Sequence, residues 1–362
     1  MKMLSPSEIT PFQLFFIIIQ TQIGVNILSL AYTVSDEAGW NGWMAIPLGG
    51  LFTAIIMIVI WAVYKRQRSS LFEMAPYLIG KVPGAFLNTL YTLFFLVIAA
   101  VALVLYAEVI TKWIFHHTPV WAVLLIMVIK AVYLVQKDVQ VMAQFYVIIS
   151  GALIILIAAI CVGLFDVNIN YIRPFGQNLD LPSLYHGMKS SILAIVGFEL
   201  VLIFFALTKG TMKQKLKASL AANLFVTVLY TISAVIPMMF FSPKEIEIVP
   251  EPVVYMLKAY STPVFERIDL VFLAIWIVFV LTSYSTYVFL ASKGVTTLFP
   301  AIKYKTAVLV VALLSYLLAL IPRNQLFIDM VTEWAGNISF LFIAGFPIFL
   351  YIFSLLRKRR PV

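Results

Sequence analysis

Ten long apolar segments decide what this 362-residue chain can fold into. Each holds roughly 20 mostly apolar residues, the length that a helix needs to cross about 30 Å of hydrocarbon. Barrel strands alternate over about 10 residues, and these segments are too long and too uniformly apolar for that pattern. We therefore expect an all-α polytopic membrane protein with ten transmembrane helices. The segments lie at about 12–34, 41–64, 84–111, 119–136, 140–165, 187–208, 216–241, 267–292, 304–322 and 335–356.

The composition excludes most other classes of protein. With 63% hydrophobic and 11% charged residues, the chain has too much apolar surface for a soluble domain. Cys161 is the only cysteine, so we expect neither an internal disulfide nor a cysteine metal cluster. The sequence motifs of zinc proteases, nucleotide-binding loops and serine hydrolases are absent, and the histidines lie at segment ends. We expect no enzyme activity, no metal site and no cofactor.

The distribution of charge predicts the orientation in the membrane. Lys and Arg gather on every second connection, beginning with the N-terminal segment and ending with the C-terminal "RKRR", whereas Asp and Glu gather on the others. Basic connections stay on the cytoplasmic side, so we expect both termini in the cytoplasm. The net charge of +9 then anchors the chain to an anionic bilayer surface and is not a nucleic-acid patch.

Two interruptions indicate internal symmetry. The first segment carries Gly24 in "TQIGVNILSL", and the sixth carries Gly197 in "IVGFEL". A unit of five helices that is repeated once must be inverted, because five is odd. Weak helix positions at matching places in two halves are the best sequence indication of a transporter-type binding site. We expect one transmembrane domain over 1–362, with repeats at about 12–165 and 187–356, and the first helix of each repeat broken.

We single out three of the ionisable side chains within the segments, where such a group costs at least about 2.5 kcal/mol at mid-span. Glu199 lies near mid-membrane, two residues after Gly197. It either binds a ligand ammonium or a proton, or it only ties the break of the first helix to the sixth helix. For Glu108 and Lys130 we expect a buried structural ion pair, with each other or with Glu199.

A group of hydroxyls lies in the eighth segment, within "LTSYSTYVFL". Beside a broken helix, such hydroxyls can coordinate Na⁺ or bind a ligand carboxylate, but they also commonly bond to their own helix or to a neighbour. Both interpretations stay open. The residues are Thr282, Ser283, Ser285 and Thr286.

The connection at about 242–266 contains a short helical pattern from about Pro252 to Tyr260. This pattern predicts either a lid over the outer vestibule or a helix that rests on the lipid headgroups.

Several motifs along the chain resemble one known family. "QIGVNILSL" followed by "DEAGWNGWMAIPLGGL" is similar to the opening of the B subunits of nutrient germinant receptors, the endospore germination permeases. "SLFEMAPYLIGK", "YIRPFG" and "GFELVLIFFALTK" fit the same family in the same order, so the resemblance extends over essentially the whole chain. It implies the LeuT-like fold of the amino acid–polyamine–organocation superfamily, a five-plus-five inverted repeat with helices 1 and 6 broken.

The resemblance also implies a function. Such a subunit binds a small nutrient, often an amino acid, in the inner spore membrane of an endospore-forming bacterium, and it signals germination through A-type and C-type partner subunits. Asn26 stands where the family usually has a second glycine, so its side chain narrows the ligand space or adds a polar group to it. Two other functions stay open: an amino acid symporter coupled to H⁺ or Na⁺, and a scaffold subunit that binds no ligand. The implied ligand-binding residues are Thr21, Gly24, Val25, Asn26 and Ile27 of the first helix and Gly197, Phe198 and Glu199 of the sixth.

Overall fold

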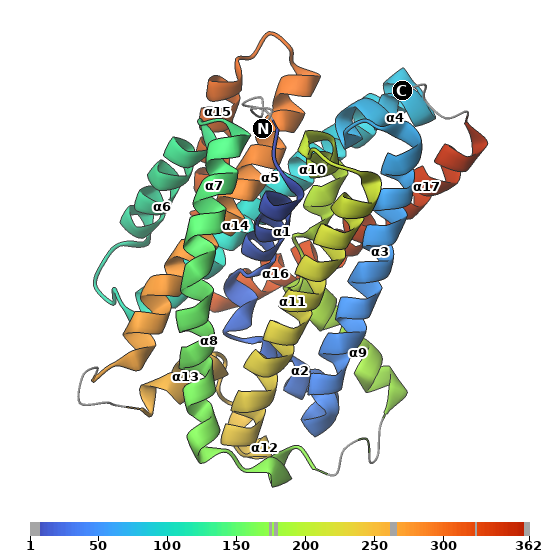
Figure 1. Ribbon diagram of the computed structural model, residues 1–362. Helices are drawn as coiled ribbons and strands as arrows, with labels where there is room; N and C mark the ends of the chain where they lie inside the picture. Colours follow the sequence, from blue (N-terminus) through green and yellow to red (C-terminus); the bar gives the residue numbers. More distant parts are fainter. Residues whose placement is uncertain (1–7, 174–175, 177–179, 261–265, 323, 358–362) are drawn as a thin grey trace.

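The computed structural model of the chain describes residues 8–173, 176, 180–260, 266–322 and 324–357. Apart from one β-bridge between Ile9 and Thr208, the regular structure of these residues is helical (Figure 1). Residues 174–175 of the "YIRPFG" motif and most of the C-terminal "RKRR" lie outside the described residues.

The helices follow one another along the chain with short connections. The first half contains α1 (Pro11–Gln22), α2 (Leu30–Ala38), α3 (Ala45–Gln67), α4 (Leu71–Ile79), α5 (Lys81–Trp113), α6 (Val120–Val135), α7 (Val139–Ile149) and α8 (Leu153–Val162). The second half contains α9 (Leu181–Ala194), α10 (Val201–Leu207), α11 (Met212–Phe240), α12 (Pro243–Ile246), α13 (Pro252–Lys258), α14 (Ile268–Leu298), α15 (Tyr304–Ala319), α16 (Gln325–Phe340) and α17 (Phe346–Leu356).

Local sequence signals set several helix starts. Thr10 and Gln13 form a capping box in front of α1, with Pro11 at its first position. Thr211 and Gln214 form the same box in front of α11. Each box satisfies backbone N–H groups that have no partner within the helix, so these two helices begin at defined residues.

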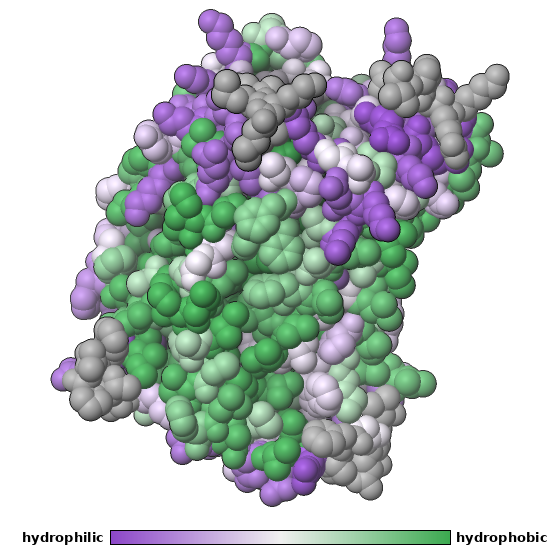
Figure 2. Space-filling view, in the orientation of Figure 1, coloured by the Kyte–Doolittle hydropathy of each residue, from purple (hydrophilic) through white to green (hydrophobic). Residues whose placement is uncertain are grey.

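The long helices α5 and α14 pack against each other along the bundle, and α1 packs against α7, α11 and α14. Both ends of the chain lie at the same end of the bundle (Figure 1). We call this end the terminal face. Figure 2 shows a broad apolar belt between two hydrophilic ends of the molecule. Large apolar side chains such as Leu93, Ile129 and Ile154 are exposed, which matches a surface that contacts lipid.

Within the described residues, six helical stretches are long and apolar enough to cross a membrane, and the pair Leu181–Ala194 and Phe198–Leu207, bent by 54°, makes a seventh. The apolar helices α6 and α15 have 16 residues each and are shorter than this criterion requires. The polytopic all-helical class is therefore confirmed, and this length criterion accounts for six to seven of the ten expected spans. The six stretches are Leu30–Gln67, Lys81–Trp113, Val139–Asp166, Met212–Phe240, Ile268–Leu298 and Gln325–Leu356.

The short helix α13 is part of the packed bundle. It contacts α11 and α14, and its side chains Val253, Val254, Met256 and Leu257 are fully buried. A helix that rested on lipid headgroups would leave its apolar face against lipid. The packing of α13 therefore favours a cover over the helix bundle. Residues 261–265 of this connection lie outside the described residues.

Candidate ligand-binding site at the two helix breaks

Both expected helix breaks occur at the glycines that predicted them. α1 ends at Gln22, and Gly24 has the non-helical angles φ −113° and ψ −143° before the 3₁₀ turn η1 (Val25–Ile27). α9 ends at Ala194, and Gly197 has φ +126° before the 3₁₀ turn η6 (Phe198–Leu200). A positive φ strongly favours glycine, so the second break depends on the residue type at position 197.

The two breaks touch each other. A Cβ atom at Gly197 would lie 3.0 Å from the carbonyl carbon of Thr21 and 3.1 Å from the backbone nitrogen of Gln22. The side-chain amide of Gln22 also donates a hydrogen bond of 2.9 Å to the carbonyl of Ile195. Segments more than 170 residues apart in the chain therefore meet at one point inside the bundle.

Side chains from α11 and α14 occupy the backbone groups that the first break exposes. The Tyr230 hydroxyl donates to the carbonyl of Gln22 at 2.7 Å, and the Trp276 indole N–H donates to the carbonyl of Gly24 at 3.2 Å. The carbonyl of Gln22 also accepts the N–H of Gly24 at 3.0 Å, so both carbonyls are hydrogen-bonded although the helix is broken. Because these carbonyls are already bonded, a ligand that used them would have to displace an aromatic side chain.

Glu199 is fully buried beside the second break. Its Oε2 accepts the N–H of Gly197 at 2.8 Å, and its Oε1 accepts the hydroxyl of Tyr287 on α14 at 2.9 Å. Within the described part of the chain, no Lys or Arg forms an ion pair with this carboxyl. Burial of a carboxylate without a cation costs free energy. A cationic group or a proton that bound to Glu199 would offset this cost.

The structural interpretation of Glu199 needs a correction in one respect. Glu199 joins its own break to α14, and it makes no hydrogen bond to the first helix among the described residues. The contact between the first and sixth helices is made instead by Gln22. The sequence did not separate these two roles, because both residues are polar groups next to a helix-weakening glycine.

Most of the hydroxyls of α14 bond to neighbouring helices. Thr282 Oγ1 lies 2.7 Å from Gln20 Oε1, and the hydroxyl of Ser283 donates to the carbonyl of Thr21 at 2.9 Å. Thr286 shares hydrogen bonds of 2.9 Å with Thr21 on α1 and with a tyrosine, Tyr146, on α7. The fourth hydroxyl, on Ser285, is buried and has no hydrogen-bond partner among the described residues.

The accessible edge of the first break is formed by η1. Gly24, Val25 and Asn26 are partly exposed, whereas Ile27 and Phe198 are fully buried. The side chain of Asn26 makes no hydrogen bond with the described residues, and no side chain caps the start of η1. Of the predicted ligand-binding residues, these three are therefore the ones that a molecule could reach without moving the packed core.

Comparison with known proteins decides the family. A family model described as "Spore germination protein" matches residues 8–328. The chain belongs to this family. Among its relatives, the spore germination protein GerQB of Bacillus cereus is 24% identical over 93% of this chain and 92% of its own length. The spore germination protein YndE of Bacillus subtilis (strain 168) is 25% identical over 99% of both chains.

Two solved structures with a similar fold are transporters. A closed conformation of Mhp1, a nucleobase-cation-symport-1 family transporter, has a TM-score of 0.61, 16% identity, and coverage of 94% of this germination protein and 78% of the transporter. A Na⁺-coupled sialic acid symporter in a substrate-bound outward-open state has a TM-score of 0.63, 11% identity, and coverage of 96% and 78%. These matches establish a LeuT-like fold for this spore germination protein.

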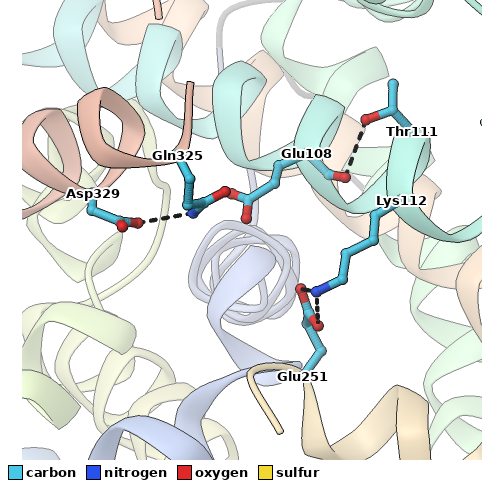
Figure 3. A network of polar contacts seen from close by, with 6 residues as sticks. All are labelled: Glu108, Thr111, Lys112, Glu251, Gln325 and Asp329. Carbon is cyan, nitrogen blue, oxygen red and sulfur yellow. Dashed lines mark hydrogen bonds and ion pairs between the residues drawn. The ribbon is translucent and has the colours of Figure 1, made fainter. Parts of the chain in front are cut away.

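The expectation of a buried pair between Glu108 and Lys130 or Glu199 is wrong. In this germination protein the partly buried Glu108 of α5 lies next to Gln325 of α16. Figure 3 shows Gln325 between Glu108 and Asp329, and Gln325 donates to Asp329 at 2.9 Å. Lys130 is exposed on α6, five residues before the helix ends, so its long side chain can extend toward the membrane surface.

Several residues of the site were not predicted by sequence reasoning. Tyr230 and Trp276 are buried aromatic residues whose polar tips bond to the break of the first helix, and the buried Tyr146 bonds to Thr282 and Thr286 of α14. Aromatic residues are common in any membrane helix, so no sequence pattern distinguishes these three. A weak signal existed for Gln22, which is a polar residue inside an apolar span next to Gly24.

Proposed function

We propose that this spore germination protein is the nutrient-sensing subunit of a germinant receptor. It binds a small nutrient, an amino acid, at mid-membrane between the first and sixth helices. The observation that carries the proposal is the fully buried Glu199, which is held by two hydrogen bonds beside the second break and forms no ion pair with a Lys or Arg among the described residues. An ammonium group of an amino acid supplies the missing positive charge.

The open edge of η1 supplies the complementary part of the site. Asn26 carries an amide that can donate to a ligand carboxylate, and the uncapped N-terminus of η1 and α2 favours negative charge. An amino acid therefore has an anionic end that suits Asn26 and a cationic end that suits Glu199. This arrangement makes Asn26 the residue that selects the ligand.

Ligand binding must be coupled to rearrangement of the breaks. The carbonyls of Gln22 and Gly24 are occupied by Tyr230 and Trp276, and Glu199 is enclosed by Tyr287. A ligand can shift such a closed state only if it binds another state more tightly. The resulting movement of the first and sixth helices is the signal that A-type and C-type partner subunits receive.

The second candidate function is that of a symporter, which is supported by the fold that this chain shares with two solved transporters. Thr282, Ser283 and Thr286 bond to the first helix, and of the four predicted hydroxyls only Ser285 has no partner among the described residues. Because three of the four hydroxyls are engaged in this helix contact, the arrangement favours reception over ion-coupled transport. A scaffold without ligand is the third candidate, and it leaves the charge of Glu199 without a role.

The proposed architecture is a single transmembrane domain of two inverted repeats, each with five helices. The paired breaks at Gly24 and Gly197 support it, because both fall in the first helix of a half. Both termini lie on the terminal face, which we place in the cytoplasm on the basis of its lysines and arginines. The protein then resides in the inner membrane of an endospore-forming bacterium.

The decisive experiment is a thermal-shift screen of the purified protein against amino acids, sugars and nucleosides. A ligand that binds the folded protein raises Tm with increasing concentration. Glu199→Gln should abolish the shift, and Glu73→Gln, which changes an exposed carboxylate on α4, should retain it. Proteoliposomes should bind the same nutrient without accumulating it. Accumulation driven by a cation gradient would instead identify a symporter.

A further inference from the structure

A cavity of about 390 Å³ opens at the terminal face, separate from the helix breaks. The connection between α6 and α7, the end of α10, the second half of α14 and the start of α15 enclose it. Its volume is in the range of small-molecule sites. The polar side chains that line it include Lys137, Asp138, Lys293, Lys303, Lys305 and Thr306.

The charge of this cavity is strongly unbalanced. Four lysines and one aspartate line it, which leaves three excess positive charges (4 − 1 = 3). The ion pairs within the described ranges involve Lys112, Lys209 and Arg267 and none of the cavity lysines. Excess charge of one sign in a concave site attracts counter-ions, so the cavity is suited to an anion.

Lys293 is the partly buried lysine of the cavity, whereas the other three are exposed. Its side chain is partly buried on α14, with Nζ 4.8 Å from the ring centroid of Tyr304 and 5.4 Å from that of Phe289. No oxygen among the described residues accepts a hydrogen bond from its ammonium. The buried Lys215 is different, because it donates to the carbonyl of Phe205 at 2.6 Å. An ammonium group that is held by aromatic rings and lacks an acceptor is free to bind one from a ligand.

The start of α15 adds further donors to the same cavity. Lys303 is the residue before this 16-residue helix and provides no side-chain cap, and residues Tyr304, Lys305 and Thr306 of the first turn line the cavity. The first N–H groups of a helix have no partner within it and carry a partial positive charge. Ammonium, hydroxyl and backbone donors together match an anion with several oxygens.

We propose that this cavity binds a phosphate group, with Lys293 as its principal contact and the start of α15 as its second. The group belongs either to the headgroup of an anionic lipid or to free phosphate, since the terminal face reaches both the membrane surface and the aqueous phase. Bound phosphate would connect α14 and α15 with the end of α10 and the connection before α7.

The elements that line the phosphate cavity also lead to the helix breaks. Lys293 follows Tyr287 by six residues on the same helix, or about 9 Å along its axis. Tyr287 holds Glu199, and the end of α10, which follows that break, lines the cavity through Leu207. A phosphate group bound here therefore stabilises the closed arrangement of the breaks.

The test measures phosphate binding to the full chain in two arms. In the first arm, calorimetry follows titration of inorganic phosphate into detergent-solubilised protein at constant ionic strength. In the second, Tm is compared in nanodiscs of phosphatidylcholine with and without phosphatidylglycerol. Saturable binding in the first arm identifies free phosphate, and a rise in Tm in the second identifies a lipid headgroup.

Variants decide whether the cavity is responsible. Lys293→Gln should weaken the affinity for phosphate about tenfold or more, the usual loss for a hydrogen bond to a charged group, and should reduce the rise in Tm in the nanodiscs. Lys305→Gln, an exposed change that leaves the packing intact, should weaken it in the same direction. The control Lys217→Gln removes an exposed lysine on α11 outside the cavity and should have no effect. The proposal is overturned if neither arm responds, or if Lys217→Gln weakens the response as much as the two cavity variants do.

Discussion

The hydroxyl of Tyr287 on α14 donates a 2.9 Å hydrogen bond to Oε1 of Glu199, beside the break of the sixth helix. The other carboxyl oxygen accepts the N–H of Gly197. Glu199 is therefore the link between an irregular backbone segment and a continuous helix of 31 residues. Because both side chains are buried, a change in the charge of Glu199 acts on α14 through this single bond.

Variants of Glu199 and Tyr287 should distinguish a functional role of this hydrogen bond from a structural one. In Glu199→Gln, the amide oxygen can accept from Gly197 and the amide nitrogen can donate to Tyr287, so we expect a small change in Tm and a loss of the nutrient response. Tyr287→Phe leaves a buried carboxyl oxygen without its donor and should lower the free energy of unfolding by about 1–3 kcal/mol. Denaturation and thermal-shift measurements in one detergent test both. A nutrient response in Glu199→Gln equal to that of the unchanged protein contradicts the proposed site.

The two glycines of the breaks should differ in their tolerance of a side chain. Gly197→Ala combines φ +126° with a Cβ atom 3.0 Å from the backbone of Thr21, and we expect destabilisation by about 1–3 kcal/mol. Gly24→Ala places its Cβ 3.7 Å from Ser283 Oγ, an ordinary contact, so its stability should change by less than about 0.5 kcal/mol. The measurement is the free energy of unfolding of each variant. Equal losses at the two positions would show that the breaks do not pack as described.

The all-helical membrane class and the two helix breaks were predictable because they depend on local composition. Gly24 and Gly197 interrupt apolar runs and have polar neighbours, which identifies a broken helix without a structure. The hydrogen-bonded environment of Glu199 was predictable for a similar reason, since a carboxylate in an apolar segment requires polar partners.

The contacts of the site were not predictable, because they depend on which helix faces meet. Lys130 lies in a helix that is apolar on every side, so the sequence does not indicate that its face is exposed. Gln22 and Ile195 are 173 residues apart, and no local pattern relates an amide in one helix to a carbonyl in another. The same holds for Tyr230 and its bond to the first break.

Asn26 should control ligand choice without contributing to stability. Its side chain is partly exposed and has no hydrogen bond with the described residues, so Asn26→Ala should alter stability by less than about 0.5 kcal/mol. The nutrient that raises Tm, or the concentration required, should change. The neighbouring Ile27 is fully buried, and Ile27→Ala should cost about 2–5 kcal/mol. An unchanged nutrient profile in Asn26→Ala would remove Asn26 from the site.

The start of α9 should be sensitive to acid. The hydroxyl and N–H of Ser183 donate to Asp180 and hold the pKa of that carboxyl below its usual value. Because the folded state has the lower pKa, the stabilisation is complete above the unfolded value near 3.8 and is lost as pH falls through the folded pKa. The protection factors of the α9 amides, which correct for the slower intrinsic exchange in acid, should therefore fall on acidification. Asp180→Asn keeps a neutral cap and should remove this dependence, whereas an identical pH profile in that variant would assign the effect to another group.

The cover helix α13 should be released when its ion pair is broken. Glu251, immediately before α13, lies 2.7 Å from Nζ of Lys112 on α5, and their side chains are 7% and 37% exposed. Solvent around Lys112 screens this pair, so we expect Glu251→Ala to cost about 1 kcal/mol and to accelerate hydrogen exchange in Pro252–Lys258 severalfold. Glu247→Ala removes an exposed carboxylate from the same connection and should leave the exchange unchanged. If both variants accelerate exchange equally, the ion pair does not hold the cover in place.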